Sequence, residues 1–331
     1  MMSNIRHKVI GGEQELIFDN LYYGITNSGR SSLRWAIESM GLKKKNILVP
    51  DYICQVVIDV LIEKEVKLYF YQVNNDLSID LDLNALKNID AVYLVSYFNE
   101  QTETLKNALF TLSIPFIIDD VFGISRPSFN NPCHWVYFNS LRKITPIADY
   151  SQIISNRELA DIVIDDLKSF AQLKYQAKDL KRRYLSSESN DEAPYLSTFI
   201  TAEHLLDDSS GIYRPSGRSC MLANTFYRSI SEETLHRQNN LAVAKQLLPD
   251  NLYIDVEPEF PSFLPIFLKK RDMVRKKLMK HNIFLAVHWP HLSIVSNHLS
   301  DNILSLPLDS RYTRFDIENI CRIIIELAYE T

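Results

Sequence analysis

Two side chains that could do chemistry each follow a short apolar run typical of a buried strand. Asp119 comes directly after residues 114–118, and Lys143 comes shortly after residues 134–139. A carboxylate at the mouth of a sheet can pair with a protonated ring nitrogen, and a desolvated lysine can become nucleophilic. Each has an ordinary alternative, because the aspartate could cap a helix or turn, as Asp120 could, and the lysine could lie exposed on the surface.

A third feature is the segment NSGRSSL at residues 27–33, which opens the first helix that we expect. Small residues and a glycine at a helix start leave backbone N–H groups free to bind an anion such as phosphate. Serine and asparagine are also ordinary N-caps, so this feature alone does not establish a phosphate site. The sequence has neither a G-x-G-x-x-G motif nor a Walker-type lysine motif, which removes the main support for dinucleotide or nucleoside triphosphate binding.

The order of these three features is what the chemistry of pyridoxal 5'-phosphate (PLP) needs. The helix start would hold the phosphate, and Asp119 would keep the pyridine nitrogen protonated so that the ring acts as an electron sink. Lys143, about two dozen residues further on, would carry the aldehyde as a Schiff base and then move protons. We therefore expect PLP as the cofactor and Lys143 as the catalytic residue.

Short apolar runs that alternate with helical patterns must position these residues. We expect strands at residues 46–50, 66–73, 91–97, 114–118, 134–139 and 150–155, and helices at residues 31–40, 52–64 and 101–113. This alternation predicts an α/β fold with a mostly parallel sheet that is covered on both faces. Ligands of such sheets bind beyond the carboxyl ends of the strands, which is where Asp119 and Lys143 lie.

The second half of the chain predicts a different pattern. A long charged helix is expected at about 157–187, and its final Lys/Arg run is interpreted as a solvated face rather than a binding patch. Further helices are expected at 219–249, 270–281 and 314–329, with strands from 252 onward, at 283–288 and at 303–306. The sequence thus predicts a large PLP-binding α/β domain, residues 1–245, and a small C-terminal α+β domain, residues 246–331.

Composition excludes several other classes of protein. The chain has 331 residues, of which 46% are hydrophobic, and a net charge of −5, so no basic footprint for a nucleic acid is present. Its 4 cysteines form no C-x-x-C pair, which argues against a zinc site or a disulfide framework. His288, His291 and His298 lack an accompanying ligand pattern, so we expect no metal site. No apolar stretch is long enough for a membrane span, and a cytoplasmic location is expected.

The chain resembles the DegT-type sugar aminotransferases, a branch of the fold-type I PLP enzymes, over nearly its whole length. NSGRSSL stands where that family has a segment like SGTAAL, and IPFIIDD resembles its IPVIEDAA. FNSLRKITPIADYS resembles the lysine segment of a subgroup that reads SLRK-x-x-P-x-x-D. ILVPDYICQVV and VNNDLSIDLDLNAL also look like segments of the family. The resemblance implies that Asp119 is the ring-nitrogen aspartate and Lys143 the Schiff-base lysine.

The resemblance also implies a fold, an assembly and a reaction. The fold would have a seven-stranded-type sheet in the large domain, and the assembly would be a homodimer with the cofactor near the subunit interface. The reaction would be transfer of an amino group from an amino acid, often glutamate, to a keto-sugar, usually nucleotide-linked. A surface polysaccharide is one product that such a sugar could serve.

The same resemblance assigns several further residues to the cofactor and the substrate. Arg30 and Ser31 replace the Thr-Ala of the family's phosphate segment, and Ser140 stands where a serine often contacts phosphate. Tyr52 is our candidate for the ring that stacks on PLP, with Cys54 as the alternative by alignment. Arg214 and Arg218 are implied on the substrate side, with a solvated surface loop as the alternative. His288 is a further substrate-side candidate that we take from its place in the sequence, with a structural role as the alternative.

Two departures from the family bear on the reaction. Phe122 stands where the family often has a glutamine or histidine that faces the hydroxyl of PLP, and phenylalanine cannot donate that hydrogen bond. Asp149 and Tyr150 replace the glycine pair that usually follows the lysine. A PLP enzyme of another outcome, such as a dehydratase, racemase or decarboxylase, therefore stays open beside the aminotransferase. A non-catalytic protein of the same fold is a third hypothesis.

Overall fold

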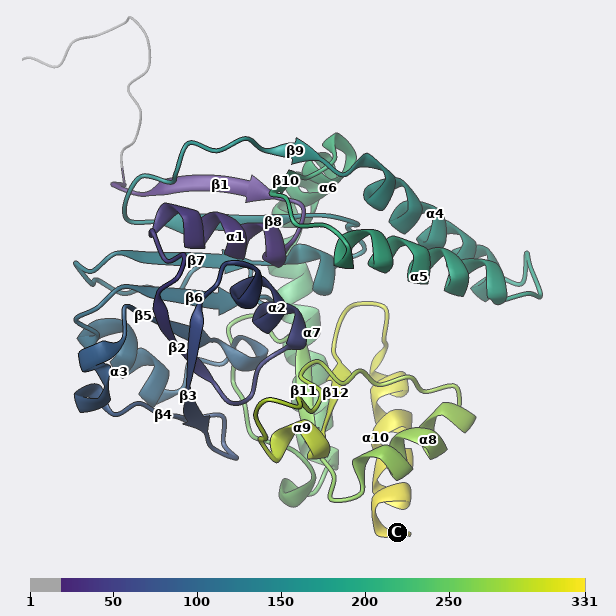
Figure 1. Cartoon of the computed structure of the whole chain (residues 1–331). Coiled ribbons are helices and arrows are strands. Elements are labelled where there is room, and N and C mark those ends of the chain that lie inside the picture. Colours follow the sequence, from purple (N-terminus) through teal and green to yellow (C-terminus); the bar gives the residue numbers. More distant parts are fainter. Residues whose placement is uncertain (1–18, 331) are drawn as a thin grey trace, which may run out of the picture.

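The computed structural model describes residues 19–330, and its centre is one sheet of eight strands (Figure 1). In order across the sheet, the strands are β1 (Tyr22–Thr26), β8 (Ser151–Ser155), β7 (Trp135–Asn139), β6 (Phe116–Asp120), β5 (Ala91–Val95), β2 (Asn46–Pro50), β3 (Lys67–Val73) and β4 (Ile79–Asp80). The run from β7 to β3 is parallel, whereas β8 and the two-residue β4 are antiparallel to their neighbours. The predicted mostly parallel sheet is confirmed, and β1 is a strand that the sequence patterns did not reveal.

Three helices pack against this sheet. α1 (Gly29–Ser39) packs on β7 and β8, α2 (Gln55–Glu63) packs on β3, and α3 (Glu103–Thr111) lies against β4. The strands β5, β6 and β7 are buried at every position, as expected for parallel strands that are covered on both faces. Ser28 has an extended backbone and is the N-cap of α1. The side chain of Ser28 accepts a hydrogen bond from the N–H of Ser31.

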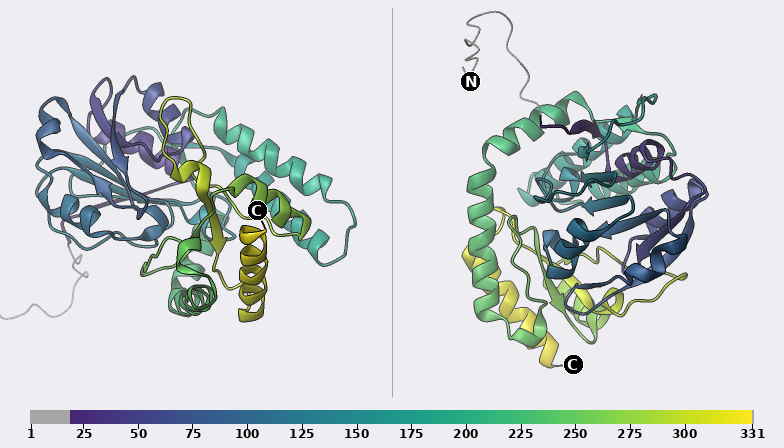
Figure 2. Two further views of the ribbon diagram at one scale, coloured as in Figure 1. Left: turned by 90° about the horizontal axis from the view of Figure 1, so that it is seen from below. Right: turned by 90° about the vertical axis from the view of Figure 1, so that its left-hand side faces the viewer.

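Two helices form a hairpin that stands out from the rest of the molecule (Figures 1 and 2). They are α4 (Lys168–Leu185) and α5 (Ala193–Asp207), and they pack along each other through a small apolar cluster of Phe170, Ala202 and Leu206. This cluster is separate from the main core, which extends over the large sheet and the C-terminal elements. The hairpin therefore depends on its own few apolar contacts and on ion pairs with the body of the protein.

The prediction of one helix at 157–187 is wrong before residue 168. The chain there crosses α1, where the ring N–H of Trp35 donates a hydrogen bond to the carbonyl of Ala160 at 3.0 Å. It then forms the short strand β9 (Asp165–Asp166), which pairs in parallel with β10 (Tyr213–Arg214). These contacts with distant segments replace the hydrogen bonds within a helix, so the helical pattern of the sequence is overridden.

The remaining elements complete the C-terminal part of the chain. The predicted helical region at 219–249 is two helices, α6 (Gly217–Arg228) and α7 (Ile230–Leu247), with a break at Ser229. In Figure 2, α7 runs alongside the sheet toward α10, and the two helices are in contact. The elements that follow α7 are β11 (Phe263–Phe267), α8 (Arg271–Lys280), α9 (Leu299–Asn302), β12 (Ile303–Pro307) and α10 (Arg314–Tyr329).

One strand predicted in this region is wrong. Residues 283–288 form no strand, and their only ladder contact within the described chain is an isolated bridge between Ala286 and Ser305. The segment turns away from β12 because Trp289 packs into an aromatic cluster at the end of the large sheet. β11 and β12 instead pair with each other in antiparallel orientation. The division into domains at 1–245 and 246–331 stays a prediction. Within residues 19–330, no helix is both long and apolar enough to cross a membrane.

Candidate functional site

A cavity of about 380 Å³ lies where the carboxyl ends of β6 and β7 meet the start of α1. The segment from Val287 to Pro290 and the α5 residue Glu203 close it from the other side. Six of the residues predicted from the sequence line this cavity, namely Arg30, Asp119, Phe122, Ser140, Lys143 and His288. Residues from four distant parts of the chain thus converge at the edge of the sheet where a ligand was expected.

Asp119 is the second-to-last residue of β6, and it is only 5% exposed. Its Oδ2 accepts a hydrogen bond from the hydroxyl of Tyr93 at 2.6 Å, whereas its Oδ1 is buried and has no partner among the described residues. Burial raises the pKa of Asp119 to about 6, although the Tyr93 hydroxyl, then the backbone N–H of Val121 and then the charge of Lys143 act in the opposite direction. A buried carboxylate oxygen without a partner is costly, so a cationic donor in the cavity would satisfy it.

The neighbouring Asp120 points to the opposite face of the strand, as alternation requires. Its carboxylate accepts hydrogen bonds from the amide of Asn99 at 3.0 Å and the hydroxyl of Tyr137 at 3.3 Å, and burial raises its pKa to about 7. A Cβ at Gly123 would lie 1.9 Å from its Oδ2, so this position needs glycine. Of the two aspartates, only Asp119 faces the cavity.

Lys143 ends a single 3-10 turn, Leu141–Lys143, that follows β7. Its N–H donates to the carbonyl of Ser140 at 3.0 Å, which fixes the backbone of the turn. Its ammonium group forms no ion pair or hydrogen bond with any described residue. Burial, and then the neighbouring charge of Arg142, lower the pKa of Lys143. A lysine in this state has a larger neutral fraction and can attack a carbonyl carbon more readily.

The start of α1 presents free donors to the same cavity. The N–H groups of Gly29 and Arg30 donate no hydrogen bond within the described chain, and both residues line the cavity. The hydroxyl of Ser140, which lines the same cavity, is buried and has no hydrogen-bond partner in the described part of the chain. The guanidinium of Arg30 pairs with Asp207 of α5 at 2.6 Å. Free amides, an unpaired hydroxyl and a nearby cation are a donor set that suits a phosphate.

Two residues predicted at the cofactor do not reach the cavity. Ser31 is fully buried, and its hydroxyl donates to Asn27 at 2.8 Å and accepts from the N–H of Tyr213. Tyr52 is 1% exposed, because its ring packs on Tyr97 and Trp289 with ring centroids 5.1 and 5.3 Å apart. Tyr52, two residues after the end of β2, is therefore turned into the core and away from the cavity.

Cys54, the alternative to Tyr52, does line the cavity. Its thiol donates a hydrogen bond to the carbonyl of His288 at 2.8 Å, and burial raises its pKa to about 12. This bond ties the segment after β2 to the loop from Val287 to Pro290. The segment after β2 thus brings a sulfur, and no aromatic ring, to the cavity.

Arg214 and Arg218 lie away from the cavity of their own chain. Arg214 pairs with Asp166 at 3.1 Å on the surface. The guanidinium of Arg218 lies 4.0 Å from the centre of the Tyr175 ring, in a separate hollow between α4 and α6. Asp149, one of the departures from the family pattern, accepts hydrogen bonds at the start of α6 and so anchors this region. A role for either arginine across a dimer stays a prediction.

Aromatic rings form one wall of the cavity. Phe122 packs edge-on against His288 and Trp289, with ring centroids 4.7 and 5.5 Å apart. Burial lowers the pKa of His288 to about 3, so its ring is neutral, and its Nδ1 lies 2.7 Å from the hydroxyl of Ser305. No group of three potential metal ligands occurs in the described chain. Trp289 belongs to this wall but was not predicted, although its place beside His288 in the sequence could have suggested it.

An ion-pair cluster forms the rim toward the helical hairpin. Glu203 of α5 accepts from Arg142 at 3.2 Å and from Lys174 of α4 at 2.6 Å. Burial alone would raise the pKa of Glu203, but these two cations lower it to about 2. Nothing in the sequence singles out Glu203, since it is one charged residue in an ordinary helix. Only the packing of the hairpin brings it beside Lys143.

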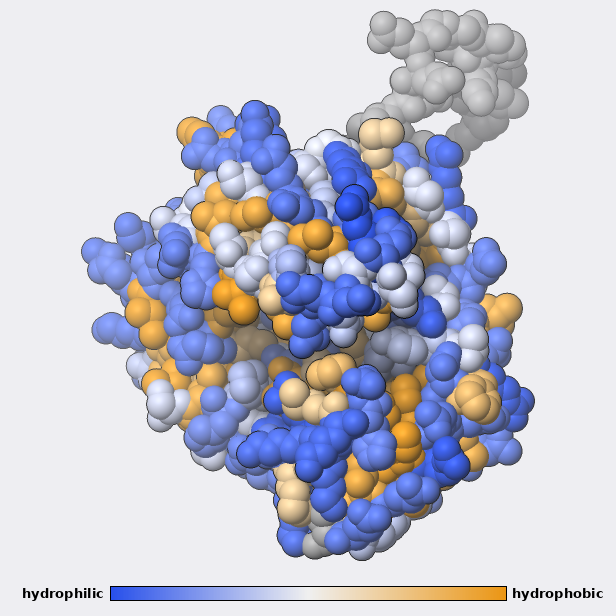
Figure 3. Space-filling model, turned by 90° about the vertical axis from the view of Figure 1, so that its right-hand side faces the viewer, coloured by the Kyte–Doolittle hydropathy of each residue, from blue (hydrophilic) through white to orange (hydrophobic). Residues whose placement is uncertain are grey.

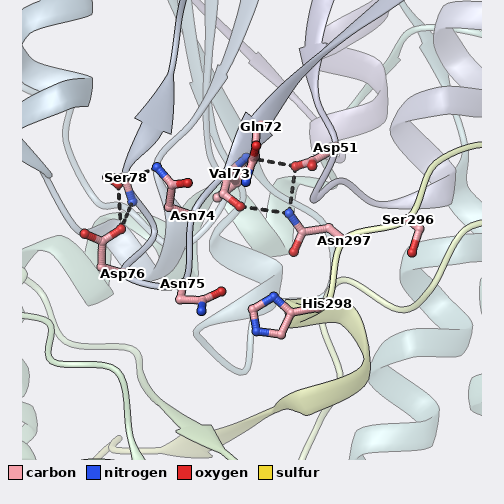
Figure 4. A pocket seen from close by; sticks show the side chains of 10 residues that line it. All are labelled: Asp51, Gln72, Val73, Asn74, Asn75, Asp76, Ser78, Ser296, Asn297 and His298. Atoms are coloured by element: carbon pink, nitrogen blue, oxygen red, sulfur yellow. Dashed lines mark hydrogen bonds between the residues drawn. The ribbon is translucent and has the colours of Figure 1, made fainter.

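A larger hollow of about 740 Å³ lies elsewhere, between the β3–β4 turn and the loop at residues 296–298 (Figure 4). Its carboxylates already have partners, because Asp51 accepts from Asn297 at 2.8 Å and Asp76 accepts from Ser78. Asn297 also donates to the carbonyl of Val73, so these bonds attach the loop to the sheet. We interpret this hollow as structural.

Comparison with known proteins identifies the fold. No protein-family model matches the sequence, and no curated protein matches it. Among solved structures, Helicobacter pylori PseC, an aminotransferase involved in the biosynthesis of pseudoaminic acid, is similar over 94% of this chain and 87% of its own, with TM-score 0.64 and 14% identity. A DegT DnrJ EryC1 StrS aminotransferase from Brucella abortus is similar over 93% and 86%, with TM-score 0.62 and 12% identity.

A third structure, DesI in the presence of its TDP-sugar product, is similar over 93% of this chain and 80% of its own, with TM-score 0.62 and 13% identity. The resemblance predicted from the sequence is thereby confirmed for the fold. The chain has the fold of the PLP-dependent sugar aminotransferases, and its cavity lies at the carboxyl edge of the sheet in that fold.

Proposed function

We propose that the protein is a PLP-dependent aminotransferase that acts on a keto-sugar with an amino acid as the donor. The observation that carries this proposal is that one cavity holds both Lys143 and Asp119, whose buried Oδ1 has no hydrogen-bond partner among residues 19–330. The residues present fit the cofactor, because they offer a carboxylate for a protonated ring nitrogen, a reactive lysine and a phosphate cradle.

The cofactor, when bound, supplies an electron sink that makes bonds at the amino-bearing carbon labile. In this proposal, Asp119 accepts a hydrogen bond from the ring nitrogen and keeps it protonated. The N–H groups of Gly29 and Arg30, with the hydroxyl of Ser140, bind the phosphate. Lys143 holds the cofactor covalently and transfers protons as a general acid and base. Phe122 and His288 line the cavity and exclude water from the reacting atoms.

The keto-sugar and its nucleotide are proposed from the solved structures that have a similar fold. PseC takes part in pseudoaminic acid biosynthesis, and DesI was solved with a TDP-sugar product. A nucleotide-linked keto-sugar is therefore the acceptor that we propose, with an amino acid such as glutamate as the donor. We also propose that the protein is a cytoplasmic homodimer, in which Arg214 and Arg218 of one subunit could face the substrate of the other.

Absorption spectroscopy tests the cofactor assignment. Purified protein that is incubated with PLP and then freed of unbound cofactor should be yellow, and borohydride should bleach the visible band irreversibly. Lys143→Ala should lose the band completely, because no other lysine lines the cavity in the described chain. Lys106→Ala, on the exposed side of α3, is the matched control and should keep it. A wild-type protein that is colourless after incubation with excess PLP and removal of the unbound cofactor contradicts the proposal.

A half-reaction tests the type of reaction. Glutamate alone should convert the bound cofactor to its pyridoxamine form and release one equivalent of 2-oxoglutarate. If the protein binds PLP but no amino acid donor produces that form, a dehydratase, racemase or decarboxylase becomes the better assignment. Phe122 is the observation that keeps this alternative open, because a ring without a donor stands where the family often has a polar group. A biological role that survives Lys143→Ala would instead favour a non-catalytic protein.

A further inference from the structure

A tight turn that follows β5 has an unusual backbone. Phe98 and Asn99 have φ angles of 58° and 62°, in the left-handed region that residues other than glycine rarely occupy. They are the only two consecutive residues with this conformation in the described chain. Asparagine tolerates it, whereas phenylalanine is strained there. Strain of this kind persists only where surrounding contacts fix the backbone, so the contacts of this turn show what it holds.

The side chain of Asn99 binds two distant segments at once. Its amide donates hydrogen bonds to both oxygens of the Asp120 carboxylate, at 3.2 and 3.0 Å. Its Oδ1 accepts a hydrogen bond from the N–H of Phe260 at 3.3 Å. Asn99 and Asp120 are 8% and 0% exposed, so water competes little for these bonds. The turn therefore fixes the carboxyl end of β6 to the C-terminal part of the chain.

Asp120 lies within a segment whose other residues form the cavity wall. Asp119, Val121 and Phe122 all line the cavity, whereas Asp120 points to the other face of β6. The N–H of Gly123 donates to the carbonyl of Asp120 at 2.9 Å, so the chain turns directly around this residue. The family segment IPVIEDAA, which IPFIIDD resembles, has an alanine at this position. The buried anchor is thus a feature of this chain.

The ring of Phe98 supports the same wall from behind. Its centroid lies 6.1 Å from that of Phe122 and 5.1 Å from that of Trp289, and both of these rings line the cavity. Figure 3 shows the face on which the hairpin and the C-terminal elements meet, with a hollow between them. Phe98, Asn99 and Asp120 are buried, so they act on a ligand only through the residues that they hold.

We propose that Asn99 and Asp120 are a positioning pair, which holds the end of β6 and so directs the carboxylate of Asp119 at the ring nitrogen of the cofactor. This inference rests on the proposed function, which places Asp119 on PLP. The Oδ1 of Asp119 has no hydrogen-bond partner among residues 19–330, so its direction depends on the backbone of β6. A displacement of about 1 Å at such a contact can cost about 100-fold in rate.

Cofactor binding tests the pair without a measurement of activity. The ligands are PLP and its 1-deaza analogue, in which a C–H group replaces the ring nitrogen. The wild-type apoprotein should bind PLP about 10- to 100-fold more tightly, because only PLP offers a charged partner to Asp119. Asn99→Gly tolerates the left-handed backbone but lacks the amide, and it should reduce this preference by about fivefold or more. Asp120→Ala breaks the same bonds from the other side and should also reduce it.

Two controls separate positioning from a loss of stability. Asp120→Asn keeps an oxygen that can accept from Asn99, so the preference for PLP should stay within about twofold of the wild type. Asn131→Gly removes a buried amide that does not line the cavity and that donates to the carbonyls of Leu109 and Leu112 at 2.9 and 3.0 Å. It should lower the unfolding temperature and leave the preference unchanged.

The outcomes separate this inference from the proposed function. A wild type that takes up no PLP overturns the proposed function. A wild type that binds PLP and the analogue equally overturns the role of Asp119 and the positioning pair with it. If Asp119→Asn loses the preference but Asn99→Gly and Asp120→Ala keep it, the inference alone is wrong. An equal loss in Asn131→Gly also overturns it, because any loss of stability would then have the same effect.

Discussion

The sheet edge and the helical hairpin bring charge to the same cavity in opposite ways. At the sheet edge, Asp119 and Lys143 are fixed by buried strands, and each lacks a charged partner of its own in the described chain. On the hairpin, Glu203 and Lys174 are held by a small apolar cluster and by shared ion pairs. The difference indicates a division of labour, in which the sheet positions the reactive groups and the hairpin closes the cavity with paired charges.

The largest expected effect at the sheet edge comes from Asp119→Asn. Loss of the carboxylate should slow the glutamate half-reaction by about 100- to 1000-fold, because the ring nitrogen loses its charged partner. Rapid-mixing absorbance measures this rate. Asp120→Asn, on the other face of β6, is the control and should retain most of it. Equal losses in the two variants would contradict the assignment of Asp119.

Asp119→Asn should stabilise the folded apoprotein, although it slows the half-reaction. Burial raises the pKa of Asp119 to about 6. The folded apoprotein therefore binds more protons than the unfolded chain between about pH 4 and pH 6, so its stability falls as pH rises through that window. Above it, Asp119→Asn should stabilise the apoprotein by roughly 1–3 kcal/mol, measured by chemical denaturation. If the Asp119→Asn apoprotein is instead less stable than the wild type at about pH 8, the prediction is wrong. Neighbouring groups would then stabilise the buried carboxylate of Asp119.

A smaller effect is expected on the hairpin. Glu203→Gln removes the carboxylate that Arg142 and Lys174 share. The free energy of unfolding should fall by roughly 1–3 kcal/mol, because two partly buried cations lose their charged partner. Chemical denaturation measures this change, and an unchanged stability would contradict a structural role for the ion-pair cluster.

The sheet edge could be predicted from the sequence because each of its features is local. The strand β2 was placed at its observed bounds, and β6 and β7 within two residues, since short apolar runs bounded by polar residues predict buried strands. Asp119 and Lys143 follow those runs directly. The resemblance already singled out Asp119, whereas the apolar run alone did not show which face of the strand Asp119 and Asp120 each occupy.

The hairpin could not be predicted in the same way. Its start at Lys168 depends on contacts of residues 157–167 with α1 and β10, which are distant in the sequence. The role of Glu203 depends on the packing of α5 against α4. Tyr52 was misplaced for a related reason, because its ring is held in the core by Trp289, more than two hundred residues away. Contacts of this kind leave no periodic signal along the chain.

The central claim is that PLP is bound covalently by Lys143 beside Asp119. The most direct measurement is borohydride reduction of the PLP-loaded protein, followed by proteolysis and mass spectrometry of the modified peptide. We predict one modification per chain, on Lys143, and no labelling in Lys143→Ala. Stable labelling of another lysine, or none on a protein that is folded and saturated with PLP, would contradict the account.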